Sequence, residues 1–209
     1  MCDRTPLRVT AGSVPGATSA HAVAGRPADC ARIGLCHYAS EAAWVLSGIN
    51  AGGNLGVDAY YSGTVGAARE AAILGRPAIA LSQYIRDAAS LDWERSARWA
   101  RHVIGELMRL PVQEGLLWNV NLPQPETDTP PAIRLVPLAV DSHILDYHRD
   151  DGPGEVSVFH YRGRYQDRPA PTGTDVHAVF SGDIGVTPVA LDATATPLVT
   201  DVQLRPLPA

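Results

Sequence analysis

Residues 43–81 read AWVLSGINAGGNLGVDAYYSGTVGAAREAAILGRPAIAL. The apolar run at 43–46 ends in Ser47 and Gly48, a pattern typical of a buried strand in a parallel sheet. The next residues, 48–62, are rich in glycine and asparagine, and an alanine-rich helix is predicted over 64–74. Gly75 is placed to end that helix, and a second apolar strand is predicted over 78–81. Strand, loop, helix and strand make a βαβ unit, which predicts an α/β fold.

The loop of this unit carries polar groups suited to an anion beside a cation. Ligands of open α/β sheets bind at the carboxyl ends of the strands, where this loop lies. Ser62, Gly63 and Thr64 open the helix, so its free amides and positive end predict a phosphate site, with Asn54 as a further candidate. Asn50 offers an amide oxygen that is a reasonable ligand for Mg²⁺ or Mn²⁺. Glycine-rich loops are also often only tight turns, and that simpler interpretation stays open.

The composition restricts the class of partner. The chain has 209 residues, a net charge of -5 and a pI of about 5.7. This acidic balance argues against a nucleic-acid duplex or an anionic membrane as partner, since both need clustered Lys and Arg. A small phosphorylated substrate requires only a local positive potential. No apolar run approaches the ~20 residues of a membrane span, and no signal-peptide core is seen, so we expect a cytoplasmic protein.

The three cysteines, Cys2, Cys30 and Cys36, show no paired spacing. The odd count argues against a disulfide framework and against a zinc site. We interpret Cys30 and Cys36 as reduced thiols of one buried helix.

Other elements follow from apolar spacing and from the residues that end helices. One helix is predicted over 28–38 behind Pro27, and the longest over 91–110, with Ser90 as N-cap and Pro111 as stop. Residues 155–164 are rich in Val, Tyr and Phe and indicate one side of a hairpin arm. Further strands are predicted over 116–120, 133–138 and 184–189.

The central stretch, SGINAGGNLGVDAYYSGTVGAAREAAILGRPAIALS at 47–82, resembles the signature segment of the SurE (survival protein E) family. Residues 25–30 are similar to that family's Gly-Thr-Pro-Ala-Asp-Cys segment, with Arg26 in place of the Thr. Residues 119–123 match its next strand, and 173–175 and 186–188 match its C-terminal landmarks. The resemblance runs from about residue 6 to residue 198.

The resemblance implies a metal-dependent phosphomonoesterase that hydrolyses nucleoside 5′/3′-monophosphates with Mg²⁺ or Mn²⁺. It also implies a Rossmann-like three-layer core with a mostly parallel sheet, and an extended C-terminal β-hairpin arm used in a homodimer or homotetramer. On this basis we expect an α/β core at 1–138, an arm at 139–175, and a return to the core with a C-terminal tail at 176–209.

The sequence departs from the family at its N-terminus. In the family, two Asp of an Asn-Asp-Asp-Gly segment and a later Ser complete the metal site with the Asn that matches Asn50. This sequence has no such segment, Asp3 lies in no comparable motif, and no catalytic residue is assigned. We expect that about one βαβ unit is absent because the start codon was assigned too far downstream, which would leave an open sheet edge and little activity.

Several alternatives remain at this point. The rival function is a catalytically inactive SurE-like subunit that only binds nucleotide or forms oligomers. His143 and His148, with the acidic residues of 141–151, are candidates for a second metal site, although a solvated charged loop is the favoured interpretation. Asp58 either orients the Asn side chains or caps the loop, and Asp175 either caps the next turn or takes part in catalysis.

Overall fold

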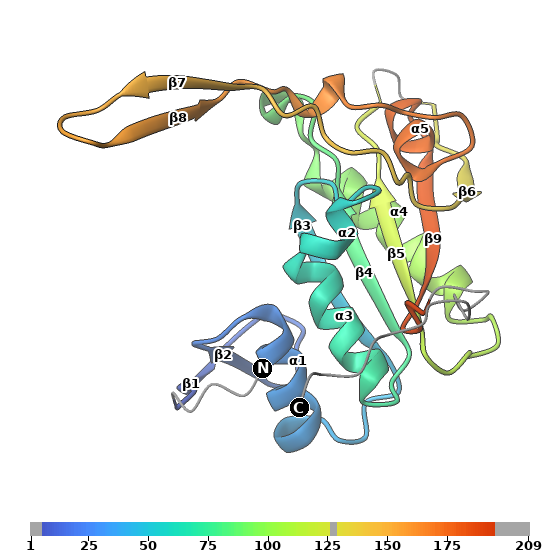
Figure 1. Ribbon diagram of the computed structural model, residues 1–209. Helices are drawn as coiled ribbons and strands as arrows, with labels where there is room; N and C mark the ends of the chain where they lie inside the picture. The colour runs from blue at the N-terminus through green and yellow to red at the C-terminus, as the bar shows by residue number, and fades with distance from the viewer. Residues whose placement is uncertain (1–5, 126–128, 195–209) are drawn as a thin grey trace, which may run out of the picture.

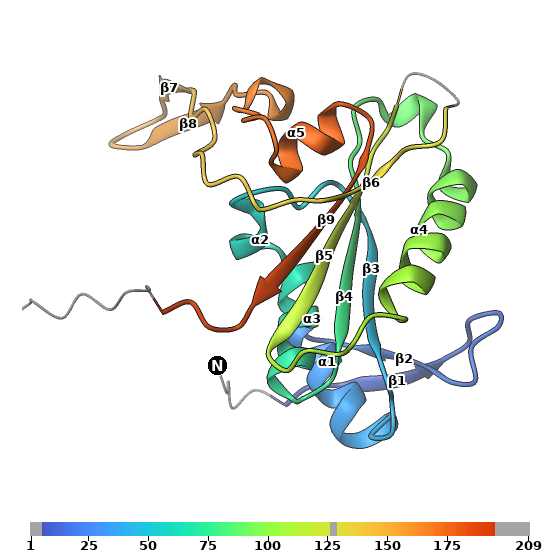
Figure 2. The same cartoon turned by 90° about the vertical axis from the view of Figure 1, so that its right-hand side faces the viewer.

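A computed structural model describes residues 6–125 and 129–194. Its centre is a five-stranded sheet in which only β9 runs against its neighbour β5, while the other pairs are parallel (Figures 1 and 2). The predicted α/β class with a mostly parallel sheet is therefore confirmed. In spatial order the strands are β3 (Val45–Ala51), β4 (Ala78–Gln83), β5 (Leu116–Leu122), β9 (Ile184–Ala190) and β6 (Ile133–Leu135).

The interior strand β4 shows why the core has three layers. All six of its residues are buried, and successive side chains point to opposite faces of the sheet. Ala78 and Ala80 pack on the face covered by α3 (Gly63–Ile73), and α1 (Pro27–Ile33) packs against α3. Ile79 and Leu81 pack on the face covered by α4 (Trp93–Leu107), which lies across the sheet from α3 in Figure 2.

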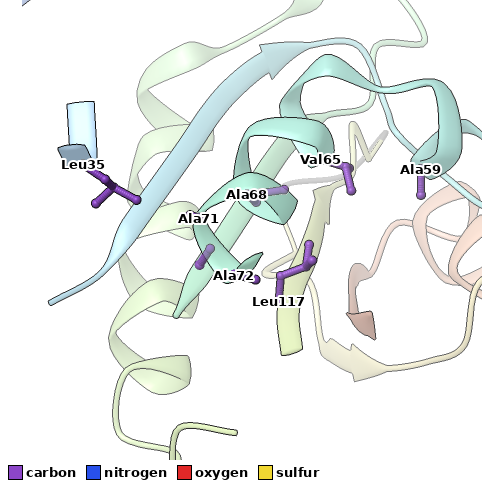
Figure 3. Close-up of a cluster of buried hydrophobic side chains, with 9 residues drawn as sticks. Leu35, Ala59, Val65, Ala68, Ala71, Ala72 and Leu117 are labelled. Atoms are coloured by element: carbon purple, nitrogen blue, oxygen red, sulfur yellow. The ribbon is translucent and has the colours of Figure 1, made fainter. Parts of the chain in front are cut away.

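The contact between α3 and the sheet is made by small side chains. Ala68, Ala71 and Val65 are fully buried and face Leu117 of β5 (Figure 3). Alanine has the highest intrinsic helix propensity, and its short side chain lets the helix approach the sheet closely. Ser62 caps the N-terminus of α3. Gly75 follows the C-cap of α3 with φ of 73°, as the sequence predicts.

The longest helix is shorter than predicted at both ends. Its N-cap is Asp92, whose carboxylate accepts a hydrogen bond from the Arg95 amide at 2.9 Å, so the prediction of Ser90 as the cap was wrong. Ser90 instead belongs to the 3-10 turn η2 (Ala88–Ser90). Both Ser and Asp are good N-caps, and the turn before the helix determined which of them is used. None of the helices in the described part of the chain is long and apolar enough to cross a bilayer.

The N-terminal part forms a small hairpin beside α1, made of β1 (Val9–Gly12) and β2 (Ala20–Val23), and α1 continues into the π-helical turn η1 (Gly34–Tyr38). Cys30 and Cys36 lie on the exposed side of this helical segment as free thiols, so the prediction that they are buried was wrong. Only Leu35 of this segment is buried. Cys2 and Asp3 lie outside the described residues.

The edge strand β3 differs from prediction where the Gly-rich loop begins. β3 extends to Ala51 instead of ending at Ser47-Gly48, so Asn50 lies in the strand and the loop starts later. The loop itself contains the short helix α2 (Asp58–Tyr61). Along its other edge, β3 pairs with no strand of the described residues.

The C-terminal part carries the arm and returns to the core. β7 (Tyr147–Asp151) and β8 (Ser157–Tyr161) form an antiparallel hairpin that projects from the body (Figure 1), which confirms the predicted arm. All ten residues of the two strands are exposed, so β7 has no apolar alternation by which the sequence could reveal it. The chain then passes through η3 (Tyr165–Asp167) and α5 (Asp175–Phe180) into β9.

Candidate active site

The proposed metal ligand Asn50 lies at the carboxyl end of β3 and is half-buried. Its side-chain amide nitrogen donates to the Gly52 carbonyl oxygen at 2.8 Å, which fixes the orientation of the amide group. Among residues 6–125 and 129–194, no group donates to its Oδ1. That oxygen therefore keeps both lone pairs for a ligand.

The start of α3 presents backbone donors. The Ser62 hydroxyl oxygen accepts a hydrogen bond from the Val65 amide at 3.0 Å, which is the usual interaction of an N-cap residue. Within the described ranges, the amides of Gly63 and Thr64 have no acceptor. A Cβ on Gly63 would lie 3.0 Å from the Pro27 ring, so the first residues of α1 and α3 adjoin here. These donors, at the positive end of an eleven-residue helix, are suited to an anion.

Asn54 is buried, and its groups bind protein. Its side-chain amide nitrogen donates to the Ser82 hydroxyl at 2.6 Å, and its backbone N–H donates to the Asn121 side chain at 2.8 Å. Its carbonyl oxygen accepts from the side chains of Asn119 and Asn121. These bonds anchor the Gly-rich loop on β4 and β5, while a contact of Asn54 with phosphate stays a prediction.

A polar cluster that the sequence did not reveal gathers around Asp58. The carboxylate accepts hydrogen bonds from the Tyr165 hydroxyl and from the Arg168 guanidinium, both at 2.6 Å, and lies 2.7 Å from the His143 ring nitrogen Nε2. It also accepts from the Leu55 amide at 3.2 Å, and Arg168 binds the Leu55 carbonyl at 3.1 Å. Asp58 thus both caps the loop and connects it to the C-terminal third of the chain.

Asp175 makes a second connection between the loop and the C-terminal segments. Its carboxylate accepts from the amides of Gly56 at 2.6 Å, Ala139 at 2.8 Å and Val176 at 2.9 Å. Burial raises the pKa of this carboxyl, although the three amides and the positive charge of Arg168 act in the opposite direction. The helix cap is Thr174, so capping, one of the two alternatives for Asp175, was wrong: its carboxylate joins three segments.

The described residues do not by themselves fit a divalent metal ion. Mg²⁺ sites use one or two carboxylates, and Asn50 supplies only a neutral oxygen. No group of three or more His, Cys, Asp or Glu suited to a metal exists in the part of the chain that the structure describes. The proposed second site is also divided: His143 contacts Asp58, whereas His148 and His160 pair with Asp150 on the arm.

The sheet, its helices and the polar groups at its carboxyl ends define a Rossmann-like α/β protein with a candidate ligand site at the carboxyl ends of β3, β4 and β5. Residues 2–142 match the family model of survival protein SurE, and the chain belongs to this family. It is 39% identical to the 5'-nucleotidase SurE of Paramagnetospirillum magneticum, with 91% of this chain and 73% of that protein covered.

Two further comparisons agree. The chain is 43% identical to a putative 5'-nucleotidase of Nostoc sp., over 81% of this chain and 73% of that protein. The crystal structure of the SurE protein from Aquifex aeolicus superposes with a TM-score of 0.78 at 30% identity, covering 93% of this chain and 77% of that one. The resemblance inferred from the sequence motifs is therefore confirmed.

Proposed function

We propose that this protein is a phosphomonoesterase that hydrolyses nucleoside 5′- or 3′-monophosphates. Its membership of a family with relatives named 5'-nucleotidase supports the class of reaction. The observation that carries the proposal is local: the free amides of Gly63 and Thr64 and the free Oδ1 of Asn50 flank one loop at the carboxyl ends of the strands.

In this proposal the phosphate binds at the start of α3. The Gly63 and Thr64 amides donate to phosphoryl oxygens, and the positive helix end stabilises their charge. The Ser62 hydroxyl, whose oxygen already accepts from the Val65 amide, still has its proton to donate to the phosphate. Asn54 anchors the Gly-rich loop through its hydrogen bonds to Ser82 and Asn121.

The proposal includes a divalent ion, Mg²⁺ or Mn²⁺, with Asn50 as one of its ligands. A bound divalent ion supplies charge neutralisation to a phosphoryl group. Because the described residues do not complete its coordination, the remaining ligands have to come from outside them. The incomplete metal coordination among the described residues favours the second candidate function, a subunit that binds nucleotide without hydrolysing it.

Phosphate release and nucleotide binding, measured side by side, separate the two candidates. For the enzyme, we expect the chain to release phosphate from adenosine monophosphate with Mn²⁺ and to stop when the ion is chelated. Calorimetric binding of the nucleotide without release would instead identify the binding subunit. If neither nucleotide binding nor phosphate release is detected, both candidate functions are refuted.

Asn50→Ala should lower Mn²⁺-dependent phosphate release and weaken Mn²⁺ binding while leaving thermal stability close to wild type. The reason is that Asn50 makes a single local hydrogen bond, worth about 0.5–1.5 kcal/mol. Asn54→Ala is the matched control, because it removes the buried side-chain hydrogen bond to Ser82 and should lower stability clearly. A large loss of stability in Asn50→Ala, with unchanged activity per folded molecule, would make Asn50 structural.

We also propose that the arm contacts a second copy of the chain in a homodimer or homotetramer. Large apolar and aromatic side chains are exposed on it, including Phe159, which is 61% exposed, Tyr147 and Tyr161. Light scattering should then report a mass of at least twice the 22.2 kDa of the chain. Removing the β7–β8 hairpin, residues 147–161, should return the mass to that of one chain. A monomeric wild-type protein would refute the proposal.

A further inference from the structure

His143, in the segment between β6 and β7, is held by the loop of the candidate site. Its Nε2 lies 2.7 Å from Oδ1 of Asp58, and its side chain is 28% exposed. The other ring nitrogen, Nδ1, has no partner among residues 6–125 and 129–194. A carboxylate bound to one nitrogen of an imidazole fixes the ring and its tautomer, and leaves the other nitrogen to exchange a proton.

The position of this histidine follows from Asp58. Asp58 lies between Asn50 and Ser62 in the chain, and its carbonyl oxygen accepts from the Ser62 amide at 2.9 Å. Asp58 and Ser62 are thus four residues apart, about 6 Å along a helix axis. The segment that carries His143 passes above the carboxyl ends of the strands on its way to the arm (Figure 1). The imidazole therefore lies beside the loop that leads into the proposed phosphate site.

The groups next to His143 belong to the cluster around Asp58. Asp58 faces the ring directly, and its second oxygen is bound by Arg168 and Tyr165. Burial, followed by the hydrogen bond to Asp58, raises the pKa of Tyr165, whose ring centre is 6.3 Å from that of His143. Tyr165 is therefore an uncharged donor near pH 7. The charged groups facing the imidazole are Asp58 and, behind it, Arg168.

We propose that His143 donates a proton to the ester oxygen that leaves the phosphorus, with Asp58 as its positioning residue. This inference rests on the proposed phosphomonoesterase function. A bond forms between the water oxygen and phosphorus, and the bond between phosphorus and the ribose oxygen breaks. The proton of the His143 imidazolium passes to the ribose oxygen, which leaves as the nucleoside hydroxyl. A proton from the attacking water returns to the imidazole, so nucleoside and inorganic phosphate are the products.

Two substrates with different leaving groups test this role. A ribose alkoxide needs a proton in order to leave, whereas p-nitrophenolate leaves without one. In His143→Gln, kcat for adenosine monophosphate should fall by about 10²–10⁴-fold, while hydrolysis of p-nitrophenyl phosphate stays close to wild type. His148→Gln, on the arm, is the matched control and should resemble wild type with both substrates.

The outcomes distinguish this inference from the function on which it rests. Equal losses of activity with both substrates would assign His143 a structural role. No loss with either substrate would show that His143 takes no part in the reaction. Both results would overturn the inference and leave the proposed phosphomonoesterase function intact. A wild-type chain inactive on both substrates would instead refute the function and the role of His143 with it. Thermal unfolding of each variant shows whether a loss reflects chemistry or folding.

Discussion

Replacement of Arg168 by methionine should destabilise the protein by about 3–5 kcal/mol, the cost of breaking a buried ion pair by removing one partner. The Arg168 side chain is only 2% exposed and that of its partner Asp58 is 15% exposed. Without the guanidinium, Asp58 stays partly buried with less compensation, and the Leu55 carbonyl loses a donor. Urea unfolding, followed by far-UV circular dichroism at pH 7, measures the change.

The surface pair of Arg134 and Asp183 provides the matched control. Its N–O distance of 2.8 Å resembles that of the buried pair, but Arg134 is 58% exposed, so Arg134→Met should cost at most about 1 kcal/mol. Adding Asp58→Asn to Arg168→Met should recover part of the loss, because the uncompensated charge is then removed. Equal costs for Arg168→Met and Arg134→Met would show that the buried pair does not hold the loop.

Substitution of Gly56 by alanine should cost about 2–5 kcal/mol, for two separate reasons. Gly56 has φ of 54°, in the left-handed region, which costs a residue with a Cβ about 1–2 kcal/mol. The new Cβ would also lie 2.6 Å from the Ala139 carbonyl oxygen, so the backbone has to move at a packed site, which adds about 1–3 kcal/mol. Thermal unfolding by calorimetry measures the total.

Two other glycines separate these contributions. Gly75 has φ of 73° and no atom within 4 Å of an added Cβ, so Gly75→Ala should show the conformational cost alone. Gly66, within α3, has neither constraint, and Gly66→Ala should stabilise the protein by about 0.5–1 kcal/mol. If Gly56→Ala lowers the free energy of unfolding no more than Gly75→Ala does, the close approach of residues 56 and 139 does not contribute to the cost.

The parts of the fold that could be predicted depend on neighbours in the sequence. The alanine run of α3, its cap at Ser62 and the apolar strand β4 all follow from local rules of propensity, capping and burial. The same local rules placed Cys30 and Cys36 on the wrong side of their helix, because they indicate a helix without showing which face another element covers.

The connections that hold the candidate site depend instead on residues far apart in the chain. Asp58 and Arg168 are 110 positions apart, and Gly56 and Asp175 are 119 apart. Neither Arg168 nor Tyr165 lies in a motif, and a single charged residue has many possible partners until the backbone is folded. Only the landmark at 173–175 gave a sequence signal for this side of the site.

The order of residues alone was thus enough to establish the α/β class and the family, and to expect the end of β3 and the start of α3 at one edge of the sheet, since a βαβ unit brings these two ends together. The folded chain decided which charges meet at that edge: His143, Tyr165 and Arg168 reach Asp58 because β9 returns beside β5 and brings the C-terminal segments over the loop. Contacts of this kind are set by packing between distant segments, and no periodic pattern in the sequence encodes them.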